Sequence, residues 1–252
     1  MKPQARAVQL AQRFSRAAAQ YQDRAWAQRQ MALPLLASLP PSAAGVVDLG
    51  CGPGSLLPEL ANRYPQAQIV NLDLSWSMLM QGRRHSKASS AWLCANLQQL
   101  PLASASQELL VSNLALQWCQ DWPAFLQQAA RVLKPSGRLH FTTLLPASLA
   151  QWRWAWQLPE SHFLPLMSLA DYQQAAAATG WRMRQQQRIF RFHYPNFRAL
   201  AQAINGVGAG LTSAQPLSLA AWRQAERRYQ CLAEPQGLPL SYSWALLELQ
   251  RP

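Results

Sequence analysis

One acidic residue and three glycines stand close together in an order that could bind a charged small molecule. Asp48 is followed by Gly50, Gly52 and Gly54, with one residue between successive glycines. Glycine permits a sharp turn and lets a ligand approach the main chain closely. A glycine-rich turn between a strand and a helix commonly binds a nucleotide, but a carboxylate beside the turn would repel a pyrophosphate and attract a cation. The spacing therefore favours a nucleoside ligand that carries positive charge.

S-adenosyl-L-methionine is such a ligand, because it has an ammonium and a sulfonium group and no phosphate. The spacing D-x-G-x-G-x-G also differs from the G-x-G-x-x-G pattern of dinucleotide sites. It resembles motif I of the class I methyltransferases, whose reaction leaves S-adenosyl-L-homocysteine as product. A purely structural glycine turn is the alternative, and it would not call for the acid at position 48.

A second acid, Asp73, ends the next predicted strand, over residues 68–73. In a βαβ unit a carboxylate at this place can accept hydrogen bonds from both ribose hydroxyls. The alternative is a helix N-cap, because a helical pattern begins at Ser75. With motif I already in the chain, we assign Asp73 and the adjacent Leu74 to the cofactor site.

Two further strand ends supply pocket candidates. Asn96 and Leu97 follow the predicted strand 91–95, where class I methyltransferases often place an aspartate that accepts from the adenine amino group. The amide oxygen of Asn96 can still accept such a bond.

The predicted strand 108–115 brings Asn113 to the crevice at the carboxyl end of a parallel sheet, followed by Gln117 and Trp118. Plain packing is the alternative role for Trp118.

These residues require alternating strands and helices to position them. The alternation up to residue 144 predicts an α/β fold with a Rossmann-like, doubly wound, mostly parallel seven-stranded sheet. We expect a single methyltransferase domain over 1–252, and within it one long helix over 4–31 and another over about 28–38. The expected parts are N-terminal helices at 1–40, a cofactor-binding core at 41–145, and a helical lid with the last two strands at 146–252.

Composition limits the class of protein. Half of the 252 residues are hydrophobic, and the formal net charge is +12. Basic residues are dense in 1–30 and 182–198, which would attract a polyanion, either a nucleic acid or an acidic protein. The four cysteines form no C-x-x-C pair, so no metal site is predicted. No apolar run approaches the roughly 18 residues of a membrane span, so we expect a cytoplasmic protein without a membrane partner.

Over about residues 14–250 the chain resembles the malonyl-acyl-carrier-protein O-methyltransferases of biotin synthesis. The resemblance rests on motif I and on six shorter segments: 14–21, 72–75, 112–119, 141–144, 204–209 and 239–242. Two positions depart from the family pattern. Asn96 replaces the usual acid, and Asn205 stands where the family commonly has lysine.

The resemblance implies transfer of a methyl group to the free carboxylate of a malonyl thioester on acyl carrier protein. That carboxylate is already ionised at pH 7, since its pKa is about 4. No general base is needed, so we predict no catalytic residue and expect alignment of the reactants to drive the reaction. The substrate-binding candidates are Tyr21, Gln117, Trp118, Arg184 and Arg188.

Other classes of function remain open at this point. A carboxyl methyltransferase for a small molecule, of the trans-aconitate type, would share motif I but would not need the arginine-rich faces. A nucleic-acid methyltransferase would explain the charge, yet the chain lacks the N/D-P-P-Y/F motif of exocyclic-amine enzymes. A non-enzymatic binding protein would not need the complete motif I.

Overall fold

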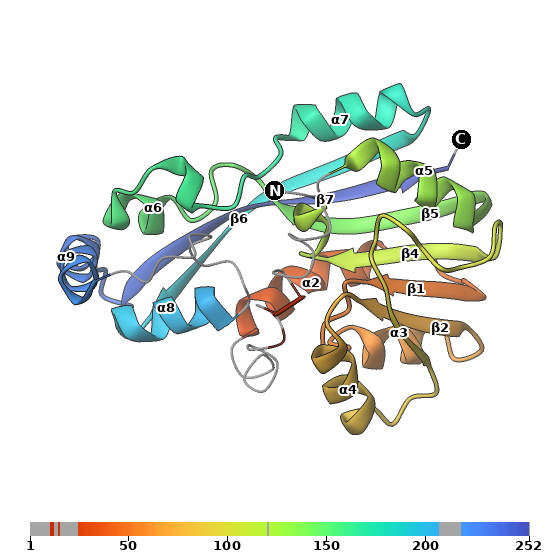
Figure 1. Ribbon diagram of the computed structural model, residues 1–252, viewed down its shortest axis with the longest axis horizontal. Coiled ribbons are helices and arrows are strands. Elements are labelled where there is room, and N and C mark those ends of the chain that lie inside the picture. Colours follow the sequence, from red (N-terminus) through yellow and green to blue (C-terminus); the bar gives the residue numbers. More distant parts are fainter. Residues whose placement is uncertain (1–10, 13–14, 16–24, 120, 207–217, 252) are drawn as a thin grey trace.

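A seven-stranded sheet forms the centre of the molecule (Figure 1). The computed structural model describes residues 11–12, 15, 25–119, 121–206 and 218–251. The strands are β1 (Gly45–Leu49), β2 (Gln68–Asp73), β3 (Ala91–Cys94), β4 (Gln107–Asn113), β5 (Leu133–Leu144), β6 (Arg182–Tyr194) and β7 (Leu238–Gln250). Their order is β3-β2-β1-β4-β5-β7-β6. Strands β1 to β5 are parallel and β7 runs antiparallel between β5 and β6, which confirms the predicted doubly wound, mostly parallel fold.

Strand β1 is central and is buried at all five of its positions. Val47 lies between Val70 of β2 and Leu110 of β4 in the ladder. A parallel strand covered on both faces needs such a continuous apolar run. Because β1, β2 and β4 are parallel neighbours, their carboxyl ends meet at one end of the sheet. The predicted cofactor residues follow the strands there, and we call this end the cofactor edge.

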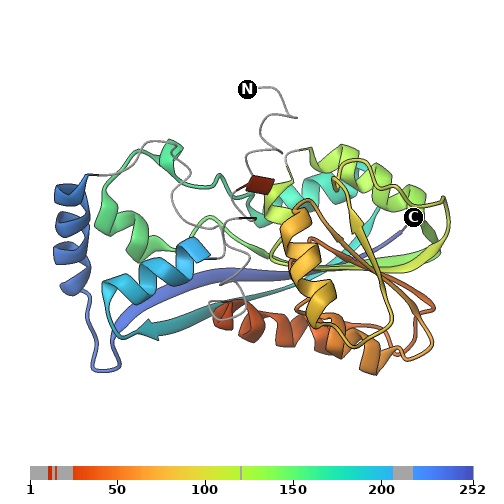
Figure 2. The ribbon, with the colours of Figure 1, turned by 60° about the horizontal axis from the view of Figure 1, so that its bottom comes forward.

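Helices cover both faces of the sheet (Figure 2). Alternate residues of β1 belong to different cores, since Val46 packs with α2 and α3 whereas Val47 packs with α5 and α7. The α-helices are α2 (Trp26–Ser38), α3 (Leu57–Arg63), α4 (Trp76–His85), α5 (Trp122–Val132), α6 (Ala150–Trp156), α7 (Leu169–Ala178), α8 (Phe197–Gly206) and α9 (Leu219–Gln230). Two short 3-10 helices are η1 (Leu116–Trp118) and η2 (Glu160–His162).

The predicted continuous helix over 4–31 is wrong at Ala25. This residue has φ −87° and ψ 21°, and α2 begins only at Trp26. Alanine- and glutamine-rich sequence favours helix throughout, but propensity is weak beside tertiary contacts. Here Ala25 is buried, and Trp26 packs edge-on against Phe192 of β6 with ring centroids 4.8 Å apart. The second predicted helix, over about 28–38, is confirmed as α2.

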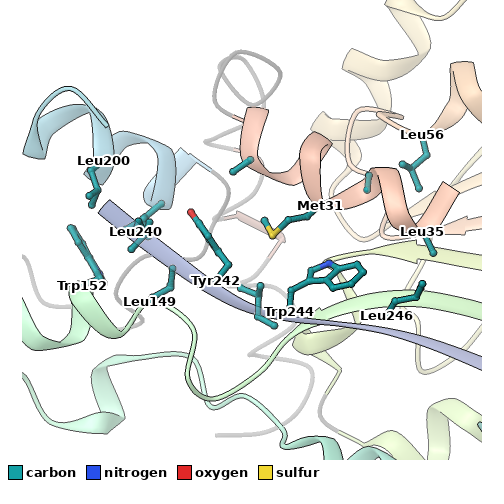
Figure 3. Packing of buried hydrophobic residues seen from close by; sticks show 14 of the residues in the cluster. Met31, Leu35, Leu56, Leu149, Trp152, Leu200, Leu240, Tyr242, Trp244 and Leu246 are labelled. Atoms are coloured by element: carbon teal, nitrogen blue, oxygen red, sulfur yellow. The ribbon is translucent and has the colours of Figure 1, made fainter. Parts of the chain in front are cut away.

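Three tryptophans after β5 pack with one another and with Phe197. Trp152 of α6 stacks on Phe197 of α8 at 5.5 Å between centroids, and Trp156 meets Trp222 of α9 edge-on at 5.1 Å. Figure 3 shows Trp152 beside Leu200 and Leu240 in the apolar core. These contacts hold α6, α8 and α9 around the outer end of β6 and β7 (Figure 1). For Trp152 and Trp156 the structure therefore supports a packing role.

Among the described residues, no helix combines the length and the apolar character needed to cross a membrane.

Candidate functional site

The glycine turn after β1 adopts a backbone that other residues would strain. Gly50, Gly52 and Gly54 have φ of +70°, +56° and +76°, the left-handed region that glycine enters without cost. A Cβ on Gly50 would lie 2.3 Å from the Cβ of Ala115, and one on Gly54 would lie 2.6 Å from the ring of Trp92. The turn is therefore tightly packed against the segments that follow β4 and form β3.

Asp73 fastens this turn to the end of β2. Its Oδ2 accepts a hydrogen bond from the Gly52 N–H at 2.8 Å, and its Oδ1 accepts one from the Ser75 N–H at 2.7 Å. The alternative role of Asp73 as helix N-cap is wrong, because Ser75 caps α4 by accepting from Met78. Burial raises the pKa of Asp73, and the two backbone hydrogen bonds act in the opposite direction. Each carboxylate oxygen keeps a second lone pair with which it could accept from a ribose hydroxyl.

Asp48 is the most buried acid of the site. Its exposed fraction is 1%, and its Oδ2 has no hydrogen-bond partner in the described part of the chain. Burial raises the pKa of Asp48 to about 8, and the charge of Asp73 adds to the shift. A buried carboxyl group without a partner is costly, and a cation beside it would favour its ionised form. This orphaned oxygen fits the cationic end of S-adenosyl-L-methionine.

Asn113, at the end of β4, is held by two side-chain hydrogen bonds. Its Nδ2 donates to the main-chain carbonyl of Gln28 at 3.1 Å, and its Oδ1 accepts from Thr142 Oγ1 at 2.7 Å. The next residue, Leu114, has φ +54°, and its N–H donates to Thr142 Oγ1 at 3.0 Å. The Asn113 amide thus ties α2, β4 and β5 together, and its contact with the cofactor stays a prediction.

Four of the remaining predicted residues lie in two places. Asn96 and Leu97, after β3, are half-buried, and Asn96 Oδ1 accepts from the Gln98 N–H at 3.0 Å. Gln117 and Trp118 form most of η1, directly after the β4 end, and are also half-buried.

Two of the substrate candidates, Arg184 and Arg188, are not brought to the motif I turn. Arg184 and Arg188 are exposed on β6, at the opposite edge of the sheet from β3. Tyr21 lies outside the described residues, and its role stays a prediction.

Sequence reasoning missed several residues of the site. Four residues support the cofactor edge only through long-range contacts: Gln28, Trp92, Ala115 and Thr142. Gln28 sits in a run rich in glutamine and alanine, so nothing local distinguished it. Within the described ranges, no group of three or more histidine, cysteine or acidic residues could hold a metal ion.

Comparison with known proteins decides the family. A family model described as a methyltransferase domain matches residues 47–141. Malonyl-[acyl-carrier protein] O-methyltransferase from Hahella chejuensis is 32% identical over 242 residues, which cover 92% of this chain and 86% of that protein. The protein of the same name from Pseudescherichia vulneris is 35% identical over 248 residues, covering 95% and 96%. The chain belongs to the malonyl-[acyl-carrier protein] O-methyltransferase family. It is thus an O-methyltransferase, and the interpretation of motif I is confirmed at the level of the family.

Longer proteins also contain a region similar to this chain. Biotin biosynthesis bifunctional protein BioHC from Cellvibrio japonicus is 31% identical over 257 residues, which cover 96% of this chain and 50% of that protein.

Solved structures share the fold at much lower sequence identity. YcgJ from Bacillus subtilis has a TM-score of 0.65 at 14% identity, covering 88% of this chain and 98% of that one. The cyclase SpnF has a TM-score of 0.59 at 17% identity, covering 90% and 81%. A protein named as a cyclase shares this architecture, so the fold alone does not determine the reaction. The assignment to the malonyl-[acyl-carrier protein] O-methyltransferase family rests on the full-length sequence similarity.

Proposed function

We propose that this enzyme transfers a methyl group from S-adenosyl-L-methionine to the free carboxylate of a malonyl group on acyl carrier protein. The product would be the malonyl methyl ester that begins pimeloyl and biotin synthesis. The observation that carries the proposal is the 32–35% identity, over nearly the whole chain, to proteins named for this substrate. We place the reaction in the cytoplasm, where acyl carrier protein and S-adenosyl-L-methionine are found.

The cofactor edge offers a separate group for each part of S-adenosyl-L-methionine. In this proposal Asp48 and the glycine turn hold the cationic amino-acid end, Asp73 holds the ribose, and Asn96 with Leu97 borders the adenine. When bound, S-adenosyl-L-methionine supplies a methyl group on a positively charged sulfur. The protein residues bind and orient it, and the hydrogen bonds from Gly52 and Ser75 to Asp73 keep that carboxylate in place.

The proposed reaction needs no proton transfer by the protein. The malonyl carboxylate, with a pKa of about 4, is already a nucleophile at pH 7. His140, the histidine buried within the sheet, lies in the middle of β5 with Nδ1 3.1 Å from Ser38 Oγ. Burial, and then the charge of Arg138, lowers the pKa of His140 to about 4. This histidine is therefore suited to packing, and catalysis would consist of alignment and exclusion of water.

The arginines of β6 offer a docking surface for an acidic carrier protein. Arg182, Arg184 and Arg188 are exposed and lie at even positions of the strand, so they share one face. Arg184 pairs across the ladder with Glu248, and Arg188 pairs with Trp244. Charges arranged in this way raise the rate of encounter with an oppositely charged partner. Protection of an exposed sheet edge is the alternative role for these arginines.

Mass spectrometry provides the direct test of the reaction. Purified malonyl-carrier protein, incubated with the enzyme and S-adenosyl-L-methionine, should gain the mass of one methyl group. No gain on the carrier, together with methylation of a free polycarboxylate such as trans-aconitate, would favour the small-molecule alternative and contradict the proposal.

Charge reversal tests the docking surface separately. The double variant Arg184→Glu/Arg188→Glu should raise KM for malonyl-carrier protein by roughly tenfold, because steering depends on these charges. It should leave KM for a malonyl-pantetheine thioester unchanged, and the effect should shrink at high salt. Arg83→Glu/Arg84→Glu on α4, where both residues are exposed, is the matched control. Equal KM changes in both double variants would show that β6 has no special part in docking.

A further inference from the structure

Gln28 in the first turn of α2 is fastened to the cofactor edge through its main chain. Its carbonyl accepts the 3.1 Å hydrogen bond from Asn113, and Asn113 is fixed in turn by Thr142. Ala115, two residues after Asn113, packs directly against Gly50 of the motif I turn. The first turn of α2 is therefore held next to the place where β4 and the glycine turn meet.

The same sheet face carries Asp48, Asn113 and α2. Asp48 lies two residues after Val46 in β1, and Asn113 lies two residues after Val111 in β4. Residues two apart in a strand point to the same face, and Val46 and Val111 pack in the core cluster that contains the buried residues of α2. Met31 of α2 faces this cluster in Figure 3. Gln28 thus lies on a helix that packs against the sheet face toward which Asp48 points.

Three buried hydrogen-bond acceptors around this edge lack donors. Gln28 Oε1, Asp48 Oδ2 and Gln117 Oε1 are all inaccessible to solvent and unpartnered among the described residues. They come from α2, β1 and the segment after β4. Buried polar atoms in native proteins are almost always hydrogen-bonded, so acceptors without donors at one edge indicate a ligand that brings the donors. An ammonium group has three donors and no acceptor.

We infer that Gln28 is a further cofactor-binding residue, whose side-chain carbonyl accepts from the ammonium group of the amino-acid tail of S-adenosyl-L-methionine. The identity of the ligand rests on the proposed function. Other parts of the ligand suit the Gln28 side-chain carbonyl less well. The sulfonium has no N–H or O–H to donate, and the carboxylate end itself requires donors. The ribose hydroxyls already have a carboxylate counterpart in Asp73.

Isothermal titration calorimetry with two ligands tests the inference without any turnover. S-adenosyl-L-homocysteine has the amino-acid tail, and 5′-methylthioadenosine lacks it. Gln28→Met keeps the length of the side chain and removes the acceptor. It should weaken the binding of S-adenosyl-L-homocysteine by roughly 10- to 100-fold, which is the contribution of a hydrogen bond to a charged group. The affinity for 5′-methylthioadenosine should not change. Gln30→Met, the same change two positions further along α2, should alter neither affinity.

Two more comparisons keep the inference falsifiable. Gln28→Glu retains an acceptor oxygen and should keep the preference for the ligand with the tail, so it serves if Gln28→Met does not fold. If Gln28→Met weakens the binding of both ligands equally, or of neither, the inference is overturned. If the wild type binds S-adenosyl-L-homocysteine through Gln28 but does not methylate malonyl-carrier protein, the inference stands and the proposed substrate fails. If the wild type does not bind S-adenosyl-L-homocysteine, both the inference and the proposed function are contradicted.

Discussion

Replacing Asp48 with asparagine should stabilise the ligand-free enzyme, most strongly at high pH. Burial raises the pKa of Asp48 from its ordinary value of 3.8 to about 8. Between these two values the folded enzyme keeps a proton that the unfolded chain has lost, so the stability of the fold decreases as pH rises. At roughly 1.4 kcal/mol per pH unit, the burial of this acid costs about 4 kcal/mol at pH 7 and about 2 kcal/mol at pH 5.5.

Asparagine removes the titration but not the polarity. An unpaired buried amide costs about 1–3 kcal/mol, so the net gain at pH 7 should be about 2 kcal/mol and should approach zero near pH 5.5. In a chain of this length a gain of about 2 kcal/mol raises Tm by roughly 4–8 °C. The variant should also bind S-adenosyl-L-homocysteine at least about tenfold more weakly, because a neutral amide attracts an ammonium group less than a carboxylate does.

Differential scanning calorimetry of the ligand-free proteins at pH 5.5, 7 and 8 measures this effect. The difference in Tm between Asp48→Asn and wild type should grow with pH. Glu59→Gln, at an exposed position of α3, is the control and should show no such trend. A Tm difference that stays constant with pH, or a variant with unchanged affinity for S-adenosyl-L-homocysteine, would refute the reasoning about this carboxylate.

Two more substitutions test the glycine turn and its attachment. Gly52→Val places a branched residue at φ +56° and should abolish binding of S-adenosyl-L-homocysteine while the circular dichroism spectrum stays that of a folded protein; unchanged affinity in calorimetry would remove the motif I argument. Asp73→Asn loses one of the hydrogen bonds from Gly52 and Ser75, so affinity should fall at least about tenfold and stability by about 1–2 kcal/mol. Asp121→Asn, at the cap of α5, is the control and should keep the affinity of the wild type.

Local signals were enough to predict the cofactor half of the fold. Apolar runs of strand length, separated by helical patterns, placed β2, β3 and β4 within two residues of their observed bounds. The glycine turn was also readable, because left-handed backbone at Gly50, Gly52 and Gly54 depends on the absence of a side chain. Motif I and the acid at the end of β2 therefore needed no tertiary information.

Long-range contacts account for what the sequence could not predict. Asp73 suited both a ribose and a helix cap, and only the structure shows that Ser75 takes the cap. The break at Ala25 follows from contacts of its neighbour Trp26 with a strand far along the chain. Gln28 became a site residue because Asn113 reaches it from β4. No local sequence pattern predicts any of these three outcomes.

The position of β7 has a consequence for synthesis on the ribosome. β7 pairs with β5 along one edge and with β6 along the other, and β6 has no second strand neighbour in the described sheet. As the chain is translated, β6 emerges before its only partner strand and stays unpaired while the ribosome makes α8 and α9. An unpaired strand invites pairing with other nascent chains, and charged side chains oppose this. Arg184 and Arg188 would then oppose aggregation of the nascent chain, before they bind any carrier protein.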